Sequence, residues 1–195
     1  APDSDVPQET HPQTGEVVFR LKHPIIGHLV EFSPDGKLLA ATSRESIHLC
    51  DAETGELLRT IPQEDAFRGT ISFTPTGDRM ATIDAVWDVT TGERICRFPE
   101  DANRWGRPVF TRDGKAIVMS WQRTLAVFDP VSGRKLRQFH HSEIGLSPSL
   151  SISADGRRLA TIGEDYEGVG AERAEHASLC FWDTGFAQPE VRTTR

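Results

Sequence analysis

The feature that most constrains this chain is an internal repeat. A five-residue motif occurs four times, and a second motif alternates with it. The copies of the first motif are Phe32-Ser33-Pro34-Asp35-Gly36, Phe73-Thr74-Pro75-Thr76-Gly77, Phe110-Thr111-Arg112-Asp113-Gly114 and Ile152-Ser153-Ala154-Asp155-Gly156. The copies of the second are Asp51-Ala52-Glu53-Thr54-Gly55, Asp88-Val89-Thr90-Thr91-Gly92 and Asp129-Pro130-Val131-Ser132-Gly133, with shorter forms at Gln13-Thr14-Gly15 and Asp183-Thr184-Gly185. Motifs that return about every 40 residues predict one structural unit repeated along the chain.

Both motifs have the composition of tight turns. In the first, Pro34 presets φ at the second turn position and Gly36 takes the last one. In the second, the short carboxylate of Asp51 can accept hydrogen bonds from the backbone N–H groups ahead of it, and Gly55 can take a positive φ. The residues expected to shape these turns are Asp35, Gly36, Asp51, Gly55, Asp88, Gly92, Asp129 and Gly133.

The segments between the turns are short and rich in strand-forming residues. In the first two units they are residues 29–32, 38–42, 47–50, 57–61, 70–73, 79–83, 85–87 and 94–98. Four strands per unit make an antiparallel meander, and only residues 170–177 carry helical periodicity. A run such as Leu38-Leu39-Ala40-Ala41 is apolar on both faces, as in a strand between two stacked units. We therefore predict an all-β chain.

Two dipeptides then point to a known family. Trp87-Asp88 and Trp182-Asp183 stand at the end of the third strand of their units, and Phe128-Asp129 and Cys50-Asp51 stand in the same place. With them the chain resembles the WD-repeat β-propellers over residues 14–185. The resemblance implies about four blades of four-stranded antiparallel meanders, in units of about 22–61, 62–98, 99–139 and 140–186. It also implies a leading outer strand at 15–21, with tails at 1–13 and 187–195.

The resemblance further implies a hydrogen-bonded set of side chains within each blade. Family blades often join a His before the first strand, a Ser or Thr on the second, an Asp in the next turn and the Trp on the third. In unit one this set falls on His23, Thr42 or Ser43, and Cys50 in place of Trp. Unit two keeps Thr82 and Trp87 but has Glu64 in the His place, with a short turn around Asp84-Ala85. No unit has the full set, and we expect unit two to be the weakest.

The repeat also predicts a core and an open question about ring closure. The expected core residues are Val30, Phe32, Leu39, Leu49, Leu58, Phe73, Ile83, Trp87, Ile95, Val109, Phe110, Val118, Phe128, Leu150, Ile152, Leu159, Phe181 and Trp182. Unit four has only three strands of its own, which residues 15–21 could complete. Family rings mostly hold about seven blades, so we rank a part of a larger propeller first, a dimer with eight blades second and a closed four-blade ring last. Open apolar edges would favour self-association.

Composition excludes several classes of protein. The 195 residues carry a formal net charge of −7 and no Lys/Arg cluster, which argues against nucleic-acid binding. No apolar run approaches the roughly 18 residues that a membrane-spanning helix needs. The three cysteines are too few for a disulfide framework and favour a reducing, cytoplasmic setting. The chain starts without Met and without a charged-then-apolar leader, so we expect no targeting segment.

The sequence gives little sign of a catalytic or metal site. His48-Leu49-Cys50 and His140-His141 hold soft ligands, but no Cys-x-x-Cys or His-x-x-x-His spacing accompanies them. We expect no metal and no cofactor. The hydroxyl groups lie mostly in turns and strands that the repeat already explains, so we expect no enzyme. A two-carboxylate glycosidase site stays open, because its geometry is spatial.

The candidate binding surface is the face that carries the loops between second and third strands. Unit four has a long insertion there, residues 163–177, which is either functional or a solvated loop. Trp and Arg, common anchors of protein interfaces, gather in loops that the resemblance places on the same face. The residues predicted to bind a partner are Trp121, Arg123, Trp105, Arg104, Arg68, Tyr166, Glu164 and Asp165. Trp105 alternatively belongs to the core between blades.

The resemblance and the lack of a catalytic constellation together predict a non-catalytic scaffold that presents loops to a partner protein or peptide. The competing hypothesis is a TolB-like or quinoprotein-like propeller that binds a small molecule or sugar, with or without catalysis. The first motif is shared with those propellers, and residues 51–62 suit the quinoprotein type. The two Trp-Asp pairs favour the WD type.

Overall fold

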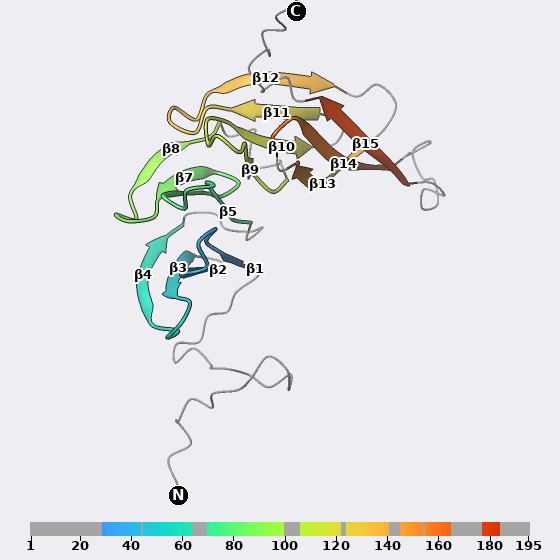
Figure 1. Ribbon diagram of the computed structural model, residues 1–195. Helices are drawn as coiled ribbons and strands as arrows, with labels where there is room; N and C mark the ends of the chain where they lie inside the picture. The colour runs from blue at the N-terminus through green and yellow to red at the C-terminus, as the bar shows by residue number, and fades with distance from the viewer. Residues whose placement is uncertain are drawn as a thin grey trace, which may run out of the picture. The chain divides into compact units, whose positions relative to one another are not determined.

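The computed structural model (Figure 1) describes residues 29–43, 45–63, 70–99, 106–121, 124–140, 145–153, 155–164 and 177–183. The described residues form strands and turns, with no helix among them. The strands are β1 (Leu29–Phe32), β2 (Leu38–Thr42), β3 (Ser46–Asp51), β4 (Leu57–Pro62), β5 (Ser72–Phe73), β6 (Arg79–Ala81), β7 (Ala85–Asp88), β8 (Arg94–Arg97), β9 (Val109–Phe110), β10 (Ile117–Trp121), β11 (Thr124–Phe128), β12 (Lys135–His140), β13 (Gly145–Ile152), β14 (Arg158–Glu164) and β15 (Ala177–Asp183).

These strands form four antiparallel sheets, each an uninterrupted meander. The orders are β1-β2-β3-β4, β5-β6-β7-β8, β9-β10-β11-β12 and β13-β14-β15, which we call blades 1 to 4. The predicted fold class, all-β with four blades of the propeller type, is confirmed. Among the described residues blade 4 has three strands, the number expected from its own repeat unit. The strand expected at 15–21 lies outside the described residues, as do residues 170–176 of the stretch with helical periodicity.

The chain divides into two compact units. Blade 1 is the described part of the first, Ala1–Gly69, and blades 2, 3 and 4 belong to the second, Thr70–Arg195. Within the second unit the face of one blade packs on the next. We call the face of a blade that is turned to the following blade its leading face, and the opposite one its trailing face.

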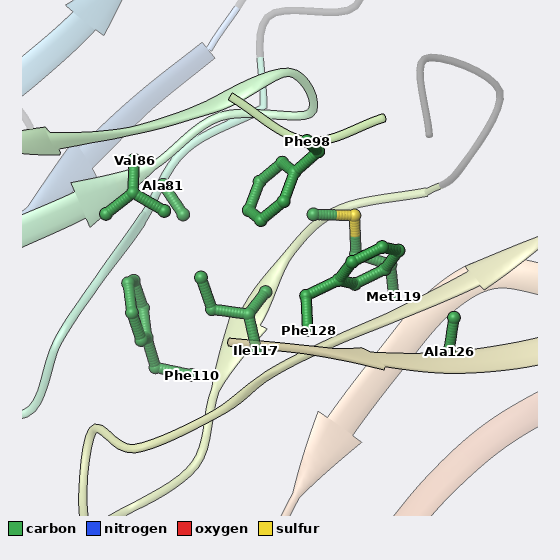
Figure 2. Close-up of a cluster of buried hydrophobic side chains, with 8 residues drawn as sticks. All are labelled: Ala81, Val86, Phe98, Phe110, Ile117, Met119, Ala126 and Phe128. Carbon is green, nitrogen blue, oxygen red and sulfur yellow. The ribbon is translucent and has the colours of Figure 1, made fainter. Parts of the chain in front are cut away.

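Blades 2 and 3 share one apolar cluster, drawn in Figure 2. Ala81 and Val86, on the leading face of blade 2, are buried there together with Phe98. They meet Ile117, Met119 and Phe128, which alternate along β10 and β11 and so share the trailing face of blade 3. The rings of Phe98 and Phe128 lie 5.2 Å apart at an angle of 55°. The stacking of the two blades therefore depends on side chains of both sheets.

A second cluster joins blades 3 and 4. The other set of alternating residues on blade 3, Val118, Leu125 and Val127, forms its leading face. They pack with Leu159 of blade 4, and Trp182 is partly buried against them. Blade 3 is thus covered by apolar side chains on both faces, as the sequence predicts for inner strands.

Four of the predicted core residues are wrong. Val30, Phe32, Leu58 and Phe181 are exposed, whereas most of the others are buried or half-buried. Leu58 lies on β4, the last strand of its sheet, and its side chain is turned to solvent. The other three lie on faces of the first and last blades. A repeat pattern predicts the same burial for every unit, because it does not show what lies against each face of a sheet.

Candidate functional site

The turns between the third and fourth strands are held by their aspartates. The carboxylate of Asp51 accepts hydrogen bonds from the backbone N–H of Thr54 at 2.8 Å and of Glu53 at 3.0 Å. The carboxylate of Asp129 accepts one from the backbone N–H of Val131 at 2.7 Å. In blade 2, Asp88 does the same with the backbone N–H of Thr91 at 2.7 Å. The closing glycines Gly55, Gly92 and Gly133 have φ between 71° and 75°. These aspartates are engaged in turn structure.

The turns between the first and second strands use a hydroxyl and a carboxylate together. In blade 1 the Ser33 hydroxyl donates to Asp35 at 2.6 Å, and in blade 3 the Thr111 hydroxyl donates to Asp113 at 2.7 Å. Blade 2 lacks an aspartate at the matching place and has Thr76 there. Its Thr74 hydroxyl donates instead to Asp78 at 2.7 Å, two residues farther along. Hence the same turn is kept with a displaced carboxylate.

These hydrogen bonds make the fold sensitive to acid. Backbone N–H groups lower the pKa of Asp51 and Asp129 below the ordinary value of 3.8, and the Ser33 hydroxyl lowers the pKa of Asp35. A carboxyl group whose pKa is lower in the folded state stabilises the fold above its unfolded pKa. That stability is lost as the pH falls through the folded pKa.

We therefore expect the free energy of unfolding to decline between about pH 5 and pH 2, and the decline to be shallower in Asp51→Asn. Urea unfolding at several pH values measures it. Glu53→Gln is the matched control, since Glu53 serves the turn through its backbone N–H. An equal slope in Asp51→Asn and the unmodified chain would contradict the assignment.

Blade 2 contains a network of three polar side chains, two of which are buried. The indole N–H of Trp87 donates to the Thr82 hydroxyl at 3.2 Å, and that hydroxyl donates to the Asp84 carboxylate at 2.6 Å. Thr82 and Trp87 are both buried. In blade 4, Trp182 donates to the Thr161 hydroxyl at 3.0 Å in the same way. These contacts join the second strand, the turn and the third strand of a blade.

Blade 1 differs from what the resemblance implies. Trp87 pairs with Met80, two residues before Thr82, and Cys50 pairs with Leu39. The residue of blade 1 that corresponds to Thr82 is therefore Ala41. The prediction that Thr42 or Ser43 holds this position is wrong. Side chains alternate between faces along a strand, so a shift of one residue moves Thr42 to the opposite face. His23 and Glu64 lie outside the described residues.

The structure brings together a hydroxyl–imidazole cluster that the sequence analysis missed. His48 Nε2 lies 2.9 Å from the Ser46 hydroxyl, and its Nδ1 lies 3.4 Å from the Thr60 hydroxyl on the neighbouring strand β4. The Ser43 hydroxyl lies 2.9 Å from that of Ser46. The sequence could have indicated the pair Ser46 and His48, because residues two apart on a strand lie on the same face. It could not have indicated Thr60, because its contact with His48 depends on the register between β3 and β4. A nucleophile–base–orienter set would need a carboxylate on the far side of His48. Thr60 has that place, and its hydroxyl cannot balance an imidazolium charge as a carboxylate does.

The described residues hold no group of three His, Cys, Asp or Glu side chains that could bind a metal ion. Of the predicted metal candidates, His48 contacts hydroxyl groups, and Cys50 is a buried free thiol whose pKa is raised by burial. His140 Nδ1 lies 3.1 Å from the Thr124 hydroxyl. In the described chain, no helix is long and apolar enough to cross a membrane.

The predicted partner-binding side chains lie outside the described part of the structure. For Trp121 and Glu164 the backbone is placed: Trp121 ends β10 and pairs with Thr124, and Glu164 ends β14 and pairs with Ala177. Both are therefore the last residues of the second strands of neighbouring blades, where the next loop begins. Arg123, Trp105, Arg104, Arg68, Tyr166 and Asp165 lie outside the described residues altogether.

Comparison with known proteins supports the fold and leaves the family unassigned. Neither a protein-family model nor a curated protein matches this chain. Among solved structures it is similar to Kuenenia stuttgartiensis hydrazine synthase, with a TM-score of 0.65 and 21% sequence identity. The match covers 79% of this chain and 45% of the other, so the matched part spans less than half the length of the hydrazine synthase chain. At this level of identity the similarity shows a shared propeller-like fold and nothing of activity.

Proposed function

We propose that this chain is a WD-type propeller segment that acts without catalysis, as a scaffold that binds a partner protein or peptide. The observation that carries the WD assignment is the network of Trp87, Thr82 and Asp84. It contains three of the four side chains that the family resemblance implies, joined in one blade at 3.2 and 2.6 Å. The Trp182 to Thr161 contact repeats part of it in blade 4.

The binding role is supported by where the loops begin. Trp121 follows Met119 and Ser120, both fully buried, so the loop at 122–123 starts from a fixed strand. Residues 165–176 follow the end of β14 in the next blade. Loops on a rigid scaffold are where proteins most often carry binding residues. Trp and Arg in such loops suit a protein interface.

The test is the double variant Trp121→Ala/Arg123→Ala, used as bait beside the unmodified chain. A partner retained by the unmodified chain is identified, and its affinity for both forms is measured by titration. We expect binding to weaken by more than about 1 kcal/mol, with little change in unfolding. Loss of stability in step with loss of binding would show that the two residues belong to the core.

A second candidate is a propeller that binds a small molecule, with or without catalysis. It is favoured by the similarity to a protein that is named as an enzyme, and by the contact between Ser46 and His48. It predicts that a sugar, a quinone-type cofactor or another small molecule raises the unfolding temperature of the chain, and that His48→Ala abolishes this effect. The scaffold proposal predicts no such effect from His48→Ala.

The proposed setting is the cytoplasm. Cys50 is buried and Cys96 is half-buried, and both are free thiols. Burial raises the pKa of each of them, which keeps the thiol protonated and slow to oxidise. Free thiols are typical of reducing compartments.

A further inference from the structure

Blade 3 ends in an open edge strand, β12 (Figure 1). Among the described residues β12 pairs with β11 alone. Lys135, its first residue, is half-buried, and the five residues after it are exposed. Alternate residues of an edge strand direct their backbone N–H and C=O groups away from the sheet, where a further strand can pair with them. β12 is therefore able to accept an added strand.

The fourth strands of blades 1 and 2 are less suited to such pairing. β4 ends at Pro62, which has no backbone N–H to donate, and its residue Ile61 is buried. β8 has only four residues, and the thiol of Cys96 on it donates to the backbone carbonyl of Pro130 in blade 3 at 3.5 Å. The neighbouring blade thus already contacts β8. Of these three fourth strands, β12 has the longest run of exposed residues.

The side chains along β12 are basic and apolar. Lys135 and Arg137 lie on the strand, and residues 134–141 hold no Asp or Glu, although the whole chain has a formal net charge of −7. Two large apolar side chains, Leu136 and Phe139, are 44% and 41% exposed. A positive and partly apolar edge is complementary to a strand that carries acidic and apolar residues.

The strand pairing determines which of these side chains share a face. Arg137 and Phe139 pair with the residues of β11 that form the leading face of blade 3, so both lie on that face. Lys135 pairs with Phe128 and lies on the trailing face. The two cationic side chains are therefore on opposite faces of the strand. Successive residues of an added strand also alternate in face, so two neighbouring carboxylates can reach both cations.

We infer that β12 binds an extended acidic peptide segment of a partner protein, which adds to blade 3 as a further strand. The segment places two successive acidic residues beside Lys135 and Arg137, and an apolar residue beside Phe139. A second copy of β12 fits this edge poorly, because its own cations would face those of the first. The inference goes beyond the proposed function, since it names a second surface, separate from the loop at 122–123, and the chemistry of what binds there.

The test uses the blocked peptide acetyl-Thr-Val-Glu-Glu-Val-Thr-amide, titrated into the full isotope-labelled chain. We expect saturable shifts of the amide NMR signals of Lys135–His140, and slower hydrogen exchange of those amides that point away from β11. Arg137→Glu is expected to raise the peptide dissociation constant about 5- to 30-fold, because it replaces an attraction with a repulsion. Arg137→Lys keeps the charge and is expected to keep the binding. The matched control is Arg59→Glu, the same change of charge at an exposed residue of β4, which is expected to leave the dissociation constant nearly unchanged.

A second peptide separates strand pairing from simple attraction between charges. Methylation of every backbone nitrogen of the probe removes its N–H donors and keeps both carboxylates, and we expect no binding of this form. The variant Trp121→Ala/Arg123→Ala is expected to bind the probe as the unmodified chain does, so the loop proposal and this one fail in different experiments. Equal binding of the methylated peptide, equal effects of Arg59→Glu and Arg137→Glu, or unchanged β12 signals at millimolar probe would each overturn the inference.

Discussion

Replacing Phe128 with alanine is expected to lower the free energy of unfolding by about 3–5 kcal/mol, because the cavity lies in a core that two blades share. The side chain is 1% exposed and belongs to the cluster between blades 2 and 3, where its ring meets that of Phe98. Its loss removes apolar contacts from both sheets at once. Urea denaturation followed by tryptophan fluorescence measures the change.

Phe139→Ala is the matched control for this prediction. Phe139 lies on β12 of the same blade and is 41% exposed. The same atoms are removed there, but a large part of the side chain is already in water. We expect a loss of about 1 kcal/mol. Equal losses in the two variants would contradict the placement of Phe128 between the blades.

Gly133→Ala is expected to be at least as damaging as a core truncation, with a loss of about 3 kcal/mol or more. Gly133 closes the turn after β11 with φ of 71°, where a Cβ is strained. In addition, a Cβ at this position would lie 2.0 Å from the backbone carbonyl oxygen of Arg97 in blade 2. A backbone atom cannot move aside as a flexible side chain can, so the two blades would have to separate.

Gly36→Ala isolates the first of these effects, the strain of a Cβ at positive φ. Gly36 has φ of 72°, but a Cβ there would meet no atom within 4 Å. The expected loss in the free energy of unfolding is therefore only the cost of placing alanine at positive φ, about 1–2 kcal/mol. Thermal and urea unfolding of both variants give the comparison. A loss in Gly133→Ala no larger than in Gly36→Ala would contradict the close approach of blades 2 and 3.

The sequence predicts the strands and turns well because both follow from local chemistry. A turn such as Asp51 to Gly55 needs a short carboxylate and a residue that tolerates positive φ, and both are visible in the sequence. Alternating apolar residues then give the faces of each strand. The role of Asp78 could not be predicted from the motif. Asp78 lies two residues beyond the usual aspartate position, and its carboxylate accepts a hydrogen bond from the Thr74 hydroxyl.

Burial at the ends of the repeat could not be predicted in this way. Phe32 and Phe181 have the same residue pattern as buried positions in the other blades, and only the surroundings of the sheet distinguish them. The cluster of Ser46, His48 and Thr60 was missed for a related reason. Its members come together through the pairing of β3 with β4, which sets His48 opposite Thr60. Register between strands is a property of the fold, and the local sequence does not show it.

The most direct test of the repeated-blade architecture is amide hydrogen exchange measured residue by residue by NMR. In blades 1, 2 and 3 the third strand lies between two partners, so its amides donate to one neighbouring strand or the other. We expect slow exchange along β3, β7 and β11, with Leu49, Val86 and Val127 among the most protected amides, and fast exchange in the turns near Gly36 and Gly55. Exchange of the β3, β7 and β11 amides as fast as that of the turn amides would contradict it.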